Sequence, residues 1–117
     1  MSGSTQALVV YVDVDDTLIR SVGPKRFPIP RVVDHIRKLR ASGAELHCWS
    51  SGGPDYARLV AKEIGVEECF KAFLPKPNVL IDDQPLSEQR LCRFVHPLTI
   101  EHQNVSEYWN EIKAAAD

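Results

Sequence analysis

An apolar run that stops abruptly at acidic residues constrains the fold of this chain more than any other feature. Residues 7–12 read Ala-Leu-Val-Val-Tyr-Val, and Asp13 follows directly. A continuous apolar run rich in β-branched residues is typical of a strand buried on both faces, as in parallel sheets. The run therefore predicts a buried strand over residues 7–12, in a domain that contains both helices and strands.

Two helix patterns alternate with a second strand pattern further along the chain. Apolar residues recur at helical spacing from Val32 to Leu39 and again from Tyr56 to Ile64. A proline stands near the start of each pattern and a glycine follows it, as is usual at helix starts and ends. Residues 45–49 lie between the two helices and read as a strand. The order up to this point is strand, helix, strand, helix.

The last third of the chain predicts two short strands and one helix. Residues 79–81 and 91–95 are rich in apolar side chains and read as strands, and an amphipathic helix is expected from Val105 onward. Asn104 and Glu107 stand at the spacing of a capping box, in which each side chain accepts a hydrogen bond from the other residue's backbone N–H. The complete order predicts an α/β domain with a mainly parallel sheet.

Length, charge and cysteine content limit the classes of protein to which the chain can belong. Its 117 residues suffice for one domain, expected over residues 7–117 after a flexible N-terminus of residues 1–6. The net charge of −2 provides no basic field for nucleic acid, and neither a membrane span nor an export signal is expected. Three cysteines without metal-site spacing argue against a disulfide framework and favour a cytoplasmic location.

Five of the sixteen acidic residues fall in two short clusters, each directly after a predicted strand. Asp13, Asp15 and Asp16 follow the first strand, and Asp82 and Asp83 follow a later one. Ligands of parallel sheets bind beyond the carboxyl ends of the strands, so both clusters are expected at one edge of the sheet. Neighbouring carboxylates repel each other, so either one of them holds a proton or both share a cation such as Mg²⁺. The alternative is a solvated loop cap, because Asp and Thr are common in turns.

These motifs, in their order, resemble those of a known family. Residues 13–17, Asp-Val-Asp-Asp-Thr, resemble the DxDxT signature of the haloacid dehalogenase superfamily, and Trp49-Ser50 resembles its second motif. Lys76 holds the place of the third motif, and residues 79–83 resemble the fourth. The resemblance covers residues 7–83 and implies a three-layer Rossmann-like fold. Short loops where family members carry insertions imply a small phosphatase-like member without a separate cap domain.

The resemblance implies a Mg²⁺-dependent phosphohydrolase that acts on a small phosphate monoester. Asp13 would be the nucleophile that takes the phosphoryl group as an aspartyl-phosphate. Asp15 would be the general acid for the leaving oxygen and then the base that activates water. Mg²⁺ would be held by Asp13, the backbone carbonyl of Asp15 and Asp82, with Asp83 in support through water. Phosphoryl transfer instead of hydrolysis would use the same nucleophile.

The resemblance also implies a phosphate-binding turn. Ser50 would donate a hydrogen bond to a phosphate oxygen. Ser51 and Gly52 open a helix, whose free backbone N–H groups suit an anion. For the two serines, a plain helix cap is the alternative.

Lys76 is the expected cation that neutralises the phosphate, although its place in the chain is awkward. It lies six residues before Asp82, so an extended chain would put it at the wrong end of a strand over residues 79–81. Either the third strand is missing, or residues 75–77 form a loop that doubles back. Substitutes for this role are Lys71, Lys25 and Arg20, and the alternative for Lys76 is a surface lysine.

Two other functions are open at this point. The chain could be a regulatory module that binds metal or phosphate without turnover, or an interaction domain that uses Trp109 and Phe27. Residues 20–30 form a Gly- and Pro-rich loop at the place of the family's mobile flap. In that loop, Lys25, Arg26 and Phe27 either contact the leaving group or cover the sheet edge. A second copy of the chain that supplies a lid, as a homo-oligomer, would be another route to specificity.

Overall fold

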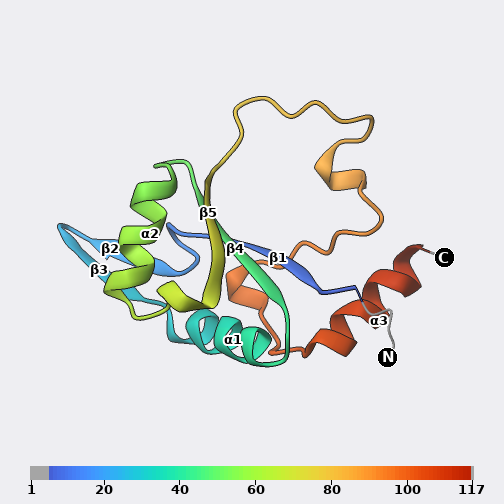
Figure 1. Ribbon diagram of the computed structural model, residues 1–117, viewed down its shortest axis with the longest axis horizontal. Helices are drawn as coiled ribbons and strands as arrows, with labels where there is room; N and C mark the ends of the chain where they lie inside the picture. The colour runs from blue at the N-terminus through green and yellow to red at the C-terminus, as the bar shows by residue number, and fades with distance from the viewer. Residues whose placement is uncertain (1–5, 117) are drawn as a thin grey trace.

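The computed structural model describes residues 6–116 (Figure 1). Within that range the chain forms a small α/β domain with three α-helices and a parallel three-stranded sheet, which is compatible with a Rossmann-like fold. Residues 1–5, and with them most of the predicted flexible N-terminus, lie outside the described residues, as does residue 117.

The parallel sheet contains β1 (Val9–Asp13), β4 (Glu45–Ser50) and β5 (Phe70–Pro75), in the order β1-β4-β5. The first two are the strands that the apolar runs predict. In the register of the sheet, Asp13 pairs with Trp49, and Trp49 pairs with Leu74. The carboxyl ends of all three strands therefore lie at the same edge of the sheet.

The three predicted helices are confirmed. Pro30 and Pro54 begin α1 (Pro30–Ala41) and α2 (Pro54–Glu63), where a residue without a backbone N–H costs nothing because that group has no intrahelical partner. The third helix, α3 (Val105–Ala116), starts with the predicted capping box. The Asn104 N–H donates to Glu107 Oε1 at 3.0 Å, and the Glu107 N–H donates to Asn104 Oδ1 at 2.8 Å.

One face of the sheet is more open than the sequence predicts. Along β4, Leu46, Cys48 and Ser50 are buried while the alternate residues are only partly buried. In β1, Val9 is 53% and Tyr11 is 50% exposed. The expectation that residues 7–12 are buried on both faces is therefore wrong. The physical reason is that only one face of the sheet packs against the core, as the alternation along the central strand β4 also shows.

The predicted Gly- and Pro-rich loop is in fact a β-hairpin. Its strands are β2 (Ile19–Val22) and β3 (Lys25–Pro28), and they pair in antiparallel register. Gly23 has a φ of 58°, which suits the two-residue turn between them. The sequence predicts a loop here because the segment is rich in proline. Pro28, however, stands at the end of a strand, where its missing N–H is tolerated.

Residues 76–95 contain no strand, so the two strands predicted over residues 79–81 and 91–95 are wrong. This segment leaves the end of β5 as a wide excursion away from the sheet, with one turn of 3-10 helix at η2 (Leu86–Glu88) (Figure 1). Val79 is 77% and Ile81 is 94% exposed. Short apolar runs form strands only when a neighbouring strand takes up their backbone hydrogen bonds, and here none does.

Two further single turns of 3-10 helix, η1 (Glu67–Cys69) and η3 (Pro97–Thr99), precede β5 and α3. The core is built from the buried faces of the sheet, α1 and α2, closed on one side by α3. Its largest fully buried apolar side chains are Leu18, Ile19, Leu46, Val14, Val32, Val60 and Val66. None of the helices described between residues 6 and 116 has the length and apolarity to cross a bilayer.

Candidate functional site

An ion pair marks the carboxyl edge of the sheet. Lys76 Nζ lies 2.9 Å from Asp13 Oδ1, and the two side chains are 35% and 30% exposed. The same ammonium group lies 5.8 Å from the centre of the Trp49 ring, which stands between them in the sheet. A cation and a carboxylate, both still reachable by solvent, are thus held together where a parallel sheet binds its ligands.

The sheet register explains why Lys76 reaches this place. β5 ends at Pro75, and the Lys76 N–H continues the pairing by donating to the Ser50 carbonyl at 3.0 Å. Side chains alternate along a strand, so Lys76 shares a face with Leu74, and through the register with Trp49 and Asp13. Lys76 therefore follows the third strand of the sheet and does not begin a fourth. From the sequence, Lys76 is expected too far from Asp13 because it is assigned to a strand over residues 79–81 that the structure does not contain.

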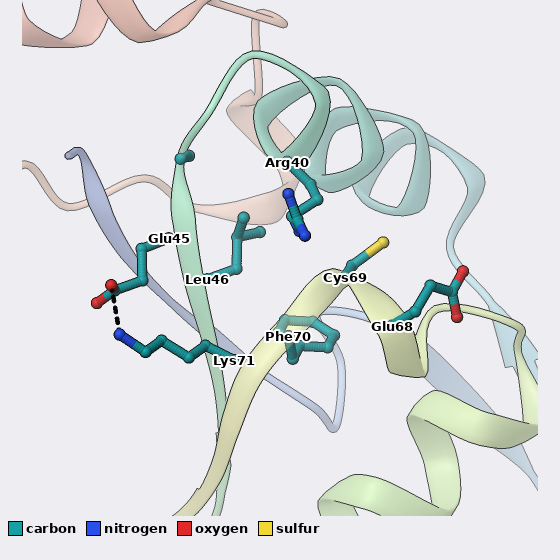
Figure 2. Close-up of a pocket in the computed structure, with 8 residues that line it drawn as sticks. Arg40, Glu45, Leu46, Glu68, Cys69, Phe70 and Lys71 are labelled. Atoms are coloured by element: carbon teal, nitrogen blue, oxygen red, sulfur yellow. Dashed lines mark hydrogen bonds and ion pairs between the residues drawn. The ribbon is translucent and has the colours of Figure 1, made fainter.

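The three substitutes for Lys76 lie elsewhere. Lys71 stands at the start of β5, where its Nζ pairs with Glu45 Oε1 at 2.9 Å (Figure 2). This pair borders an open cavity of about 280 Å³ at the amino ends of β4 and β5, the end opposite to Asp13. Lys25 and Arg20 are exposed residues of the hairpin. Of the four basic residues considered, Lys76 is the one that the structure pairs with Asp13.

A tight turn after β1 fixes the second oxygen of Asp13. The carbonyl of Val14 accepts hydrogen bonds from the N–H groups of Thr17, Leu18 and Ile19, at 3.2, 2.9 and 3.2 Å. The turn folds Thr17 back, and its Oγ1 donates to Asp13 Oδ2 at 3.1 Å. Thr17 belongs to the quoted motif, but its role was not predicted. The sequence feature that could have indicated this role is the spacing of four residues between Asp13 and Thr17, which suits a side chain that reaches back across a turn.

The Asp15 side chain is exposed and is held by one neighbour. Tyr56 OH, from α2, donates to Asp15 Oδ1 at 2.7 Å. Burial first, and then the hydrogen bond and charge of Asp15, raise the pKa of Tyr56, so its hydroxyl keeps its proton and acts as the donor. The sequence suggested only a packing role for Tyr56, since no local pattern reveals a contact across 41 positions.

The turn after β4 has the geometry of a helix entry. Ser50 is 1% exposed, and its Oγ accepts a hydrogen bond from the Gly52 N–H at 3.0 Å. Its own hydroxyl proton is not used in that contact and can be donated. Ser51 and Gly52 are exposed just before α2 begins at Pro54. The turn thus combines one buried hydroxyl with the positive end of a helix dipole, two groups that attract an anion.

Asp82 and Asp83 are not gathered with the first acid cluster. Both are exposed in the excursion over residues 76–95. Asp82 Oδ1 accepts from the Gln84 N–H at 3.0 Å, and Oδ2 accepts from Gln89 Nε2 at 3.2 Å. The hydrogen bond of the Gln84 N–H foremost, and then those from Asp83 and Gln89, hold the pKa of Asp82 below its usual value.

The donor chemistry of the acids fits Mg²⁺, but their arrangement does not assemble a site. Carboxylate and carbonyl oxygens are the ligands that Mg²⁺ prefers. Among residues 6–116, however, no three His, Cys, Asp or Glu side chains lie close enough together to hold a metal ion. Both oxygens of Asp13 instead have partners within the chain, Lys76 and Thr17. Binding of the ion by the four predicted aspartates would require residues 76–95 to move.

Comparisons of the chain with models of protein families, with curated proteins and with solved structures found no match. What points to a function is therefore the sequence motif together with the residues that the fold gathers at the end of the sheet.

Proposed function

We propose that this chain is a Mg²⁺-dependent phosphohydrolase of the haloacid dehalogenase type, which hydrolyses a small phosphate monoester through an aspartyl-phosphate on Asp13. The Asp13–Lys76 ion pair at the carboxyl end of the sheet is the observation that carries the proposal. A carboxylate nucleophile needs a nearby positive charge to approach an anionic phosphate, and Lys76 supplies one. Ser50 and the start of α2 add donors at the same edge.

The proposed reaction has two steps. In the first, an Asp13 oxygen bonds to phosphorus while the bond from phosphorus to the leaving oxygen breaks, and Asp15 gives its proton to that oxygen. In the second, Asp15 takes a proton from water, and the water oxygen displaces Asp13 from phosphorus. Free phosphate leaves, and Asp13 and Asp15 regain their starting states. Lys76 has to exchange its contact with Asp13 for one with the phosphate oxygens.

Mg²⁺, when bound, would neutralise the charge of the phosphate and of Asp13. Its ligands would be Asp13, the Asp15 carbonyl and Asp82, with Asp83 in support. β1 is an edge strand, and residues 79–81 are an exposed apolar run. Parallel pairing of this run with the free edge of β1 would carry Asp82 and Asp83 to the carboxyl end of β1. We include this rearrangement in the proposal, because it also covers apolar side chains that are otherwise in water.

A fold without a separate cap is part of the proposal. The hairpin β2–β3 follows the turn after Asp15, in the part of the chain where the flap was predicted. Arg26 pairs with Glu63 on α2, which favours a role in covering the sheet over one in contacting the leaving group. Phe27 is 49% exposed beside it and is free to contact a substrate or a second copy of the chain.

One observation favours the alternative of a regulatory module without turnover. Both oxygens of Asp13 already accept from Lys76 and Thr17, so the nucleophile is occupied until these contacts break. A module of this kind would bind metal or phosphate and hydrolyse nothing. The interaction domain built on Trp109 gains less support, since Trp109 is partly buried and packs against the core.

The deciding experiment measures phosphate release from a panel of phosphate monoesters, with Mg²⁺ and with EDTA. Wild type is compared with Asp13→Asn and with Asp34→Asn, an exposed aspartate of α1 that serves as the matched control. We expect turnover that needs Mg²⁺, disappears in Asp13→Asn and persists in Asp34→Asn. Silence of the wild type on the whole panel, with phosphate or Mg²⁺ still bound, would support the regulatory module.

A further inference from the structure

Tyr56 joins α2 to the exposed aspartate of the motif. It lies in the first turn of the helix, and its hydroxyl donates to Asp15 Oδ1 at 2.7 Å. This is the one hydrogen bond from another side chain that the described structure gives to Asp15. Asp15 is otherwise exposed, so without Tyr56 its carboxylate would rotate among several orientations.

The ring of Tyr56 is itself confined by two neighbours. Arg26, from the hairpin, lies with its guanidinium carbon 5.8 Å from the ring centre. Two hydrogen bonds, of 3.0 and 2.8 Å, tie the same guanidinium to Glu63 at the end of α2. Gly52 also lies close to the ring, since an added Cβ there would come within 2.9 Å of Tyr56 Cδ2. The hairpin and the turn before α2 thus both confine the ring.

We propose that Tyr56 is a positioning residue, which holds the Asp15 carboxyl group in the orientation that proton transfer requires. This inference rests on the proposed function, because it assigns Asp15 the role of general acid and base. Tyr56 occupies Oδ1, so the proton that Asp15 transfers is carried on Oδ2. A proton fixed on one oxygen in one direction is transferred more readily than one on a freely rotating group.

The basicity of the leaving group determines how strongly the orientation of Asp15 affects the rate. When the departing oxygen is strongly basic, as in phenyl phosphate, it must be protonated as it leaves. When it is a stable anion, as in para-nitrophenyl phosphate, it departs without a proton. Loss of a residue that orients the general acid therefore slows the first substrate and spares the second. A residue that merely supports the fold or the phosphate site would affect both alike.

The test compares kcat and KM for these two substrates in wild type, Tyr56→Phe, Asp15→Ala and the double variant. Tyr11→Phe makes the same chemical change at a tyrosine whose hydroxyl has no hydrogen bond to a described residue, and it serves as the control. We expect Tyr56→Phe to lower kcat about tenfold for phenyl phosphate and less than about twofold for para-nitrophenyl phosphate, with KM unchanged. In the Asp15→Ala background, Tyr56→Phe should have no further effect.

A second readout does not depend on turnover. The thermal unfolding midpoint should fall by several degrees on Tyr56→Phe in the wild-type background and by less in the Asp15→Ala background, because the bond is already lost there. Equal losses of kcat on both substrates, or equal midpoint shifts in both backgrounds, would overturn the positioning role and leave the phosphohydrolase intact. A wild type that hydrolyses neither these two substrates nor any other monoester of the panel overturns the proposed function, and with it the catalytic role of Tyr56.

Discussion

Lys76 Nζ lies 2.9 Å from Asp13 Oδ1, across the carboxyl end of β4, the strand between β1 and β5. The two residues come from opposite edges of the three-stranded sheet, and the lysine side chain spans the central strand over the Trp49 ring. Partly exposed ion pairs of this kind contribute little to stability, about 0–1 kcal/mol. The free energy of unfolding therefore depends little on this pair.

Replacement of this lysine should separate activity from stability. We expect Lys76→Ala to lower kcat/KM about a hundredfold or more, since it removes the cation next to the phosphate, and to change the free energy of unfolding by about 1 kcal/mol or less. Phosphate release and urea denaturation measure the two effects. Lys71→Ala is the control, because it breaks the Glu45 pair at the far end of the same strand. Equal losses in both variants would remove Lys76 from the site.

Asp82 should matter for the metal and not for the fold. Its side chain is exposed, and its two hydrogen bonds come from Gln84 and Gln89 of the same irregular segment, so Asp82→Asn should leave the unfolding midpoint nearly unchanged. We expect it to raise the Mg²⁺ concentration needed for half-maximal turnover at least about tenfold. Hydrogen exchange supplies a direct check, since residues 79–83 should become protected when Mg²⁺ is added. Unchanged exchange and unchanged metal dependence would argue that the ion is held without Asp82.

Stability should decline in weak acid because of His35. This residue is 4% exposed, and its Nε2 lies 2.7 Å from Tyr108 OH, which joins α1 to α3. Burial first, and then the nearby His102 and Lys38, lower the pKa of His35 below 6.5. The unfolded chain therefore binds the proton more readily, and the free energy of unfolding falls as the pH drops below about 6.5, by at most about 1.4 kcal/mol per pH unit.

Urea denaturation of wild type, His35→Gln and His96→Gln at several pH values measures this effect. The decline should be shallower in His35→Gln, which cannot take up the proton. His96 is exposed, so His96→Gln should behave as wild type does. If His35→Gln keeps the full slope, another group is responsible for the acid sensitivity.

Only one of the three thiols should react in the folded protein. Cys92 is exposed, whereas Cys48 and Cys69 are buried. Burial, with a smaller contribution from the Asp13 charge, raises the pKa of Cys48 to about 12, and burial also raises the pKa of Cys69. The thiolate is the reactive form, so an aromatic disulfide reagent should modify one thiol quickly at neutral pH and all three in denaturant. Fast reaction of a second thiol would indicate local opening around β4 or β5.

Local patterns predicted much of the fold. The strands at β1 and β4, the helices α1 and α2 and the capping box of α3 all follow from apolar spacing and from residues suited to element ends. The helices and the capping box depend on contacts between residues a few positions apart, and β1 and β4 are marked by apolar runs of their own. The hairpin strands and β5 were not predicted, because their sequences contain prolines. Their pairing depends on the hairpin turn in one case and on the neighbouring strand β4 in the other. The runs over residues 79–81 and 91–95 show the converse, since a strand-like sequence stays irregular when no strand lies beside it.

The sequence by itself determined which chemical groups the protein has: the acids after the first strand, the serine turn after the next and a lysine further on. Only the tertiary structure decided which of them meet. Lys76 reaches Asp13 because the order β1-β4-β5 and its register put both at one edge and on one face. Tyr56 reaches Asp15 because α2 packs back against the sheet beside the turn that follows β1. Both contacts join residues far apart in the chain, and such contacts are created by strand order and helix packing, which no local run of residues encodes.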